Sequence, residues 1–204
     1  LLPDKKSRIE IIYNGVDLDI FRPFKSTVLF DKFGIDAGNR LIGYIGLITQ
    51  RKGLEYLIKA FSLIKEKYNK CQLIIIGGYK KNDEAYFSGI MELIKELHLE
   101  SDIFLTGELS DISYPLNSLD IIVLPSLEER CSRTLLESLA TAKAIVATKV
   151  GGTPEIIDDG INGILVEAKN EKQIADAVLR FLSNNKLRDM MGKNARIKAE
   201  KFFD

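Results

Sequence analysis

Residues 40–77 read RLIGYIGLITQRKGLEYLIKAFSLIKEKYNKCQLIIIG, in which two apolar runs flank a stretch of mixed polarity. The outer runs, 40–46 and 71–77, are nearly continuously apolar, which is typical of strands covered on both faces of a parallel sheet. Between them, residues 53–68 repeat apolar side chains at three- and four-residue spacing, which predicts a helix with one apolar face. Strand, helix and strand in this order form the βαβ unit of a parallel sheet.

The same alternation of apolar runs and amphipathic stretches extends to both sides of this unit. Further strands are expected at 9–13, 102–107, 120–126, 144–150 and 163–166, and further helices at 84–98, 111–118, 133–142, 171–183 and 186–202. The sequence therefore predicts an α/β fold with a doubly wound parallel sheet. Because ligands of such sheets bind beyond the carboxyl ends of the strands, the loops that follow the strands are the first places to look for a site.

Size and composition favour a single globular domain over residues 1–204. The chain has 204 residues, 46% of them hydrophobic, and its 29 basic and 29 acidic residues balance, which argues against a nucleic-acid partner. Cys71 and Cys131 lie far apart and outside any C-x-x-C pair, so no disulfide or zinc site is expected and a cytoplasmic location is predicted. The chain does not begin with Met, and we expect it to be a piece of a longer protein.

The segment PSLEERCSRTLLESLA, residues 125–140, follows a predicted strand and opens a predicted helix. Ser132 is a plausible N-cap, since its hydroxyl can accept a hydrogen bond from a first-turn amide. The amides of Arg133, Thr134 and Leu135 would then point into the crevice and form an anion site at the helix N-terminus.

Two carboxylates, Glu129 and Glu137, flank this predicted anion site with seven residues between them. Carboxylates would repel a phosphate, but they are good acceptors for the hydroxyl groups of a ribose or a hexose. The alternative is that Glu129 is an ordinary loop charge and Glu137 an ordinary surface residue of the helix.

The pair of glutamates resembles the E-x7-E signature of glycosyltransferase family 4, whose members have the GT-B fold of two facing Rossmann-like domains. Three further segments resemble the same family, at 13–23 (YNGVDLDIFRP), 46–61 (GLITQRKGLEYLIKAF) and 144–166 (AIVATKVGGTPEIIDDGINGILV). The match to the family extends over nearly all of residues 9–183. The resemblance implies the C-terminal, donor-binding domain of such an enzyme, with the N-terminal acceptor domain absent from this chain.

The resemblance also implies roles for individual residues. Glu137 matches the glutamate that holds the nucleotide ribose, and Glu129 matches the one beside the transferred hexose and the reacting centre. Lys52 and the amides near Thr134 and Leu135 match the groups that bind the donor diphosphate. Thr106 and Gly107 end a strand where the family seats the base, largely by backbone contacts.

The sequence departs from the family pattern at the donor loops. The glycine that ends the first strand, Gly46, is followed by Leu47 where the family usually has arginine, and Arg51 is the candidate to replace that charge. The first glutamate is followed by Arg130, Cys131 and Ser132 instead of a glycine-rich tripeptide, so the sugar pocket is expected to differ in shape.

The function implied by the resemblance is retaining transfer of a hexose from a UDP-, GDP- or ADP-sugar to a hydroxyl acceptor, with no cofactor and no metal. The partners are then the nucleotide sugar and the missing N-terminal domain, without which this piece is expected to be inactive or weakly active. A non-catalytic nucleotide-sugar-binding module and a glycogen- or starch-synthase-like polymerase remain alternatives. A Rossmann-type oxidoreductase is disfavoured, because no G-x-G-x-x-G fingerprint is present.

The last predicted helix, 186–202, is basic and amphipathic. We expect its apolar face to pack against its own domain. The alternative is contact with a membrane surface, which would make the full enzyme peripheral at the inner face of the membrane.

Overall fold

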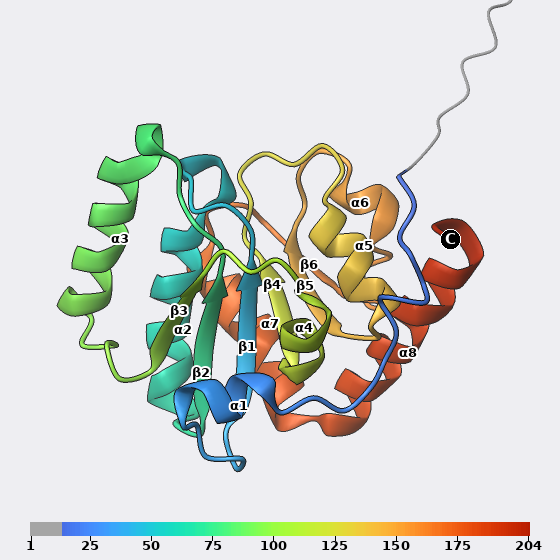
Figure 1. The fold of residues 1–204 in the computed structure, drawn as a ribbon, viewed down its shortest axis with the longest axis horizontal. Helices are drawn as coiled ribbons and strands as arrows, with labels where there is room; N and C mark the ends of the chain where they lie inside the picture. The colour runs from blue at the N-terminus through green and yellow to red at the C-terminus, as the bar shows by residue number, and fades with distance from the viewer. Residues whose placement is uncertain (1–13) are drawn as a thin grey trace, which may run out of the picture.

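A computed structural model describes residues 14–204 and contains, within that range, one six-stranded parallel sheet (Figure 1). The strands lie in the order β3-β2-β1-β4-β5-β6. Their bounds are Arg40–Ile45 (β1), Cys71–Ile76 (β2), Ile103–Gly107 (β3), Ile121–Leu124 (β4), Ala144–Thr148 (β5) and Ile164–Val166 (β6). The predicted doubly wound sheet is confirmed, and the strand expected at 9–13 lies outside the described residues.

All the predicted helices are present, and two short helices that the sequence did not reveal join them. The predicted ones are Leu54–Lys67 (α2), Glu84–Glu96 (α3), Ser113–Ser118 (α4), Arg133–Ala140 (α5), Glu171–Ser183 (α7) and Asn185–Phe202 (α8). The additional ones are Val28–Phe33 (α1) and Thr153–Ile156 (α6), and 3-10 turns occupy Gln50–Lys52 and Lys81–Asp83. Helix α6 has only four residues, too few for a periodic pattern to be recognised.

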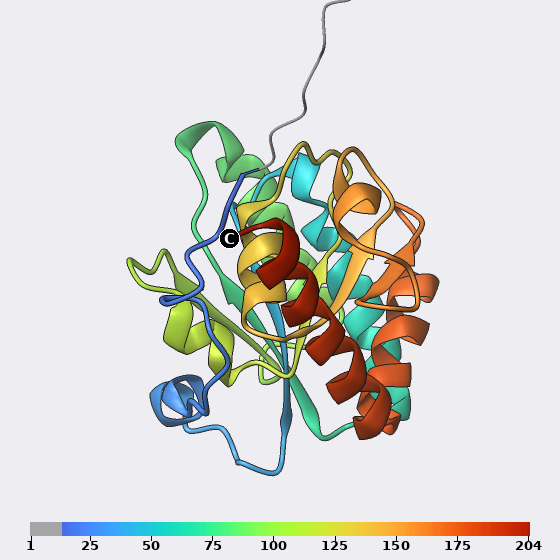
Figure 2. The same ribbon diagram turned by 90° about the vertical axis from the view of Figure 1, so that its right-hand side faces the viewer.

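The helices cover both faces of the sheet (Figures 1 and 2). On one face α2, α3 and α7 build a core around the fully buried Phe61 and Phe181. On the other face α1, α4, α5 and α8 contribute a second core, to which α8 supplies the buried Ala195 and Ala199. The expectation that the last helix packs against its own domain is therefore confirmed.

The order of strands changes at β1. Strands β2 and β3 lie on one side of β1, and β4, β5 and β6 lie on its other side. From β1 the chain continues into α2 on one face, and from β4 it continues into α5 on the opposite face. The loops that leave the carboxyl ends of β1 and β4 therefore diverge, and this topological switch point is where such sheets bind ligands.

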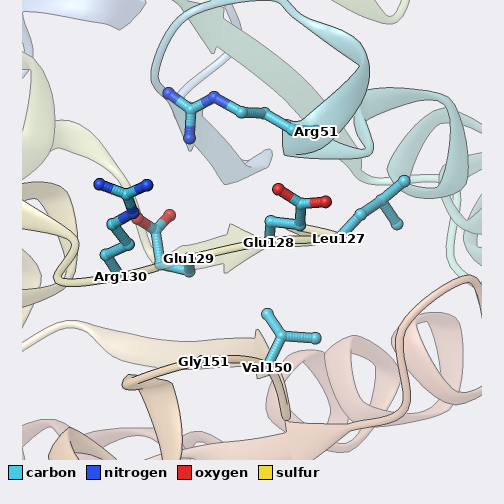
Figure 3. Close-up of a pocket in the computed structure, with 7 residues that line it drawn as sticks. All are labelled: Arg51, Leu127, Glu128, Glu129, Arg130, Val150 and Gly151. Carbon is cyan, nitrogen blue, oxygen red and sulfur yellow. The ribbon is translucent and has the colours of Figure 1, made fainter.

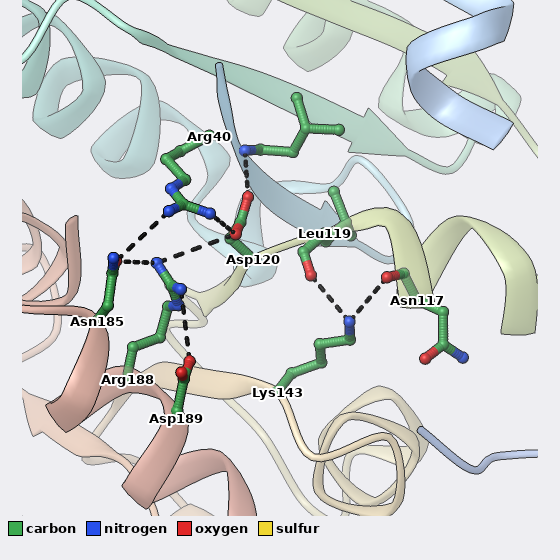
Figure 4. Close-up of polar contacts among 9 residues, drawn as sticks. Arg40, Asn117, Leu119, Asp120, Lys143, Asn185, Arg188 and Asp189 are labelled. Atoms are coloured by element: carbon green, nitrogen blue, oxygen red, sulfur yellow. Dashed lines mark hydrogen bonds and ion pairs between the residues drawn. The ribbon is translucent and has the colours of Figure 1, made fainter. Parts of the chain in front are cut away.

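A polar network fastens the opposite, amino-terminal edge of the sheet (Figure 4). Asp120, just before β4, accepts hydrogen bonds from the Leu41 amide and from Arg40 Nη1, both at 2.9 Å. Lys143, just before β5, donates to the carbonyls of Asn117 and Leu119, also at 2.9 Å. Burial lowers the pKa of Lys143 to about 8.

Replacing Asp120 by alanine is expected to lower the free energy of unfolding by about 2–3 kcal/mol, because an amide and a guanidinium lose a charged acceptor. Urea denaturation followed by circular dichroism measures this loss. Asp189→Ala is the control, since Asp189 contacts Arg188 at 3.4 Å but its side chain is 64% exposed, and a change below about 1 kcal/mol is expected there. Equal losses in the two variants would contradict a structural role for the network.

Candidate functional site

The loops after β1 and β4 are fastened to each other through their backbones. The Leu127 amide donates to the Arg51 carbonyl at 2.7 Å. Gly53 has a φ of +63°, and a Cβ at this position would lie 2.3 Å from the carbonyl oxygen of Pro125. Since no other residue fits so close an approach, Gly53 sets the distance between the two loops.

The loop after β5 lies directly against the loop after β4. A Cβ on Gly151 would lie 1.6 Å from the carbonyl oxygen of Glu129, and a Cβ on Gly152 would lie 2.3 Å from that of Arg130. The Gly152 amide donates to the Glu129 carbonyl at 3.3 Å. Backbone contacts thus hold the residues around Glu129 in place.

These three loops enclose a cavity of about 460 Å³, here called the central cavity (Figure 3). It is lined by Arg51, Leu127, Glu128, Glu129, Arg130, Val150 and Gly151. Arg51 comes from the loop after β1 and Arg130 from the loop after β4. Both arginines are exposed, and no hydrogen bond or ion pair joins either guanidinium to another residue in the range 14–204. Two positive charges are therefore available to an anionic ligand.

Glu129 and Lys52 form an ion pair at this cavity. Lys52 Nζ donates to Glu129 Oε2, and Ser126 Oγ donates to the same oxygen at 3.3 Å. The two charged side chains are only 16% and 9% exposed, respectively. The sequence placed both residues in the site but did not indicate that they bind each other, because the contact spans 77 positions of the chain.

The predicted helix cap is confirmed at the start of α5. Ser132 Oγ accepts a hydrogen bond from the Leu135 amide at 3.2 Å, and the Ser132 carbonyl accepts from the same amide at 3.1 Å. The structure thereby corrects one expectation, since the Leu135 amide is engaged in the cap and does not face the crevice. The amides of Arg133 and Thr134 have no acceptor within the helix, and their role as anion-binding donors stays a prediction.

Glu137 lies in a second cavity, of about 690 Å³, here called the α5 cavity. Its lining consists of Ile20, Phe21, Leu109, Ser110, Asp111, Ile112, Arg133, Thr134 and Glu137. Burial raises the pKa of Glu137, and the nearby charge of Arg133 opposes that rise. The structure thus brings Glu129 to Arg51 and Lys52 at the central cavity, and Glu137 to Arg133 and Thr134 at the α5 cavity.

Gly46, Thr106 and Gly107 line neither cavity and instead join the carboxyl ends of three strands. The Gly46 amide donates to the Ile76 carbonyl at 2.9 Å, and the Gly77 amide donates to the Gly107 carbonyl at 3.0 Å. Thr106 Oγ1 also donates to the Gly107 carbonyl, at 2.7 Å. The assignment of Thr106 and Gly107 to a nucleotide base stays a prediction.

Several lining residues were missed by sequence reasoning. Arg130 was noted only as a departure from a pattern, and Asp111 carried no signal. Ile20 and Gly151 lie in segments that resemble the family, but the resemblance did not assign either of them to a site. Each reaches its cavity from a different loop or from the segment before α1, so only the folded chain shows that they belong to a site.

Comparison with known proteins shows the family of the chain. A family model described as glycosyl transferases group 1 matches residues 25–198. The chain belongs to this family. N-acetyl-alpha-D-glucosaminyl L-malate synthase of Bacillus anthracis is 28% identical, over 92% of this chain and 48% of that protein. This member thus spans about half the length of that relative.

Two solved structures of similar fold extend the comparison. Anabaena Alr3699/HepE in complex with UDP superposes with a TM-score of 0.90 at 24% identity, over 96% of this chain and 53% of that one. The C-terminal domain of the glycosyl transferase group 1 protein LpcC from Francisella tularensis gives a TM-score of 0.84 at 31% identity, over 92% and 97% of the two chains. In the described part of this group 1 member, no helix is long and apolar enough to cross a bilayer.

Proposed function

We propose that this domain binds a nucleoside diphosphate sugar and presents it for transfer of the hexose to a hydroxyl acceptor, with retention at the anomeric carbon. The observation that carries the proposal is the pair of cavities at the start of α5, one lined by unpaired arginines and the other by a half-buried glutamate. The solved relative HepE, which binds UDP and UDP-glucose, supports this class of ligand.

In this proposal the diphosphate lies at the N-terminus of α5. The amides of Arg133 and Thr134, together with Arg51 and Lys52, stabilise the negative charge that grows on the leaving nucleoside diphosphate. The family pattern has an arginine where this chain has Leu47. Arg51 and Arg130 supply the positive charge that is missing from that position. These fixed charges stabilise the negative charge of the diphosphate, as a metal ion does in other transferases, so no metal is required.

The two glutamates hold the sugars on either side of the diphosphate. Glu137 accepts a hydrogen bond from a ribose hydroxyl in the α5 cavity, and Glu129 accepts from the hexose in the central cavity. The acceptor site then belongs to a part of the enzyme outside this chain. A non-catalytic module would bind the diphosphate through the same two guanidinium groups, so turnover by the full-length enzyme separates the two readings.

Titration calorimetry of this domain with UDP, GDP, ADP and NAD tests the proposal. At least one nucleoside diphosphate is expected to bind, and NAD is not. Binding of NAD alone would overturn the proposal. With the full-length enzyme, the anomeric configuration of the product, measured by NMR, tests retention, and chain-length analysis of the product tests the polymerase alternative.

We also propose a cytoplasmic location with peripheral contact at the inner face of the membrane. The exposed side of α8 supports such a contact, since Met190, Ile197 and Phe202 lie there among basic residues. Flotation of the full-length enzyme with anionic vesicles is the test, and absence from the vesicle fraction would remove the membrane contact from the proposal.

Replacing Glu137 by glutamine is expected to stabilise the ligand-free domain and to weaken nucleotide binding by about tenfold. Because burial raises the pKa of Glu137 in the folded state, its ionised form costs stability above the unfolded pKa, and this cost disappears as the pH falls. The melting temperature of the variant should therefore exceed that of the wild type at neutral pH, by a margin that narrows in acid. A variant that is less stable and binds nucleotide normally would remove Glu137 from the site.

A further inference from the structure

The ion pair between Lys52 and Glu129 sets a condition on ligand binding. In the proposed function Lys52 binds the diphosphate and Glu129 binds the hexose, yet here each side chain is engaged by the other. Both are largely withdrawn from water, at 16% and 9% exposure. A ligand that takes only one of the two therefore leaves the other as a buried charge without its partner, which is unfavourable.

We propose that Glu129 discriminates the nucleotide sugar from the sugar-free nucleotide by competing for Lys52. A nucleoside diphosphate draws Lys52 away from Glu129 and has no hexose hydroxyl to donate a hydrogen bond to the released carboxylate. A nucleotide sugar draws Lys52 away as well, but its hexose hydroxyls donate hydrogen bonds to the released carboxylate. The inference rests on the proposed function and adds that the domain disfavours its own product.

The backbone of Glu129 is held in place, so its largely buried carboxylate starts from a fixed position when Lys52 leaves. Its carbonyl accepts from the Gly152 amide at 3.3 Å, and the backbone of Gly151 lies against it with no room for a Cβ. Among the described residues, the donor that remains to its carboxylate is the Ser126 hydroxyl, at 3.3 Å from Oε2. One hydroxyl at that distance is a weak replacement for an ammonium group.

The other charges of the central cavity do not discriminate between the two ligands. Arg51 and Arg130 are unpaired toward the described residues, so each can bind a diphosphate with or without a sugar attached. Glu128 lines the same cavity and is exposed, and no lysine or arginine within 14–204 pairs with it. Glu128 therefore offers a matched control for the removal of a carboxylate.

The experiment compares Glu129→Gln and Glu128→Gln by titration calorimetry with UDP and UDP-glucose, or with the corresponding GDP or ADP pair if the wild type binds that one. In Glu129→Gln the sugar-free nucleotide is expected to bind about tenfold more tightly, since Lys52 is released from its partner. Binding of the nucleotide sugar should stay unchanged or weaken, so the ratio of the two dissociation constants changes at least tenfold. In Glu128→Gln both affinities should change together.

If the wild type binds both ligands and Glu129→Gln binds the sugar-free nucleotide no more tightly than the wild type does, this inference is overturned and the proposed function stands. A wild type that binds no nucleotide would overturn both. Glu129→Asp serves if the glutamine variant unfolds, because the shorter side chain loosens the ion pair and should tighten binding of the sugar-free nucleotide in the same direction. A Glu129→Asp variant that binds the sugar-free nucleotide as the wild type does would count against the inference in the same way.

Discussion

Replacing Lys52 by alanine is expected to weaken binding of UDP, GDP and ADP alike by about 10- to 100-fold. The variant loses a charge-assisted hydrogen bond to the diphosphate. It also leaves the Glu129 carboxylate, which is only 9% exposed, without its partner and facing the incoming anion. Both effects act on the diphosphate, so the size of the loss should not depend on the base or the sugar.

Titration calorimetry with the three nucleotides measures this loss, and thermal unfolding shows whether the variant keeps its fold. The control is Lys59→Ala, which removes an exposed lysine of α2 that does not line the central cavity. A loss confined to one nucleotide would contradict the assignment of Lys52 to the diphosphate. The double variant Lys52→Ala with Glu129→Gln should recover part of the affinity, because it removes the repelling carboxylate.

The order of strands and helices along the chain could be predicted because it depends on local sequence patterns. The runs around Ile42 and Ile74 are nearly continuously apolar, and the helix 54–67 carries its apolar residues on one side. Such patterns depend on neighbouring residues and not on distant parts of the chain. The structure accordingly places these elements within a few residues of the expected bounds. The short helices α1 and α6 were not predicted, because neither carries a periodic pattern of its own that marks it as a helix.

The candidate site was predictable only in part. The cap at Ser132 could be inferred because it involves residues three positions apart. The ion pair of Lys52 with Glu129 could not, because its geometry depends on how two loops, 77 positions apart in the chain, approach each other. The placement of Arg130 in the central cavity depends in the same way on the contact between its carbonyl and Gly152.

Replacing Gly151 by alanine is expected to lower the free energy of unfolding by about 2–4 kcal/mol and to weaken nucleotide binding. Gly151 has a φ of +51°, and the added Cβ would lie 1.6 Å from the carbonyl oxygen of Glu129. A backbone atom cannot turn aside as a side chain can, so the loop after β4 must move. That movement would displace Glu129 and Arg130 from the cavity they line.

Gly160→Ala separates the contact from the backbone conformation. Gly160 has a φ of +75°, yet nothing lies within 4 Å of a Cβ placed there, so the variant should lose only the ~1–2 kcal/mol of a left-handed alanine. Urea denaturation of both variants gives the two losses, and their difference is the cost of pushing the loops apart. Equal losses with unchanged nucleotide binding in Gly151→Ala would mean that the loop after β4 adjusts freely. The glycines would then not be what holds Glu129 beside Lys52.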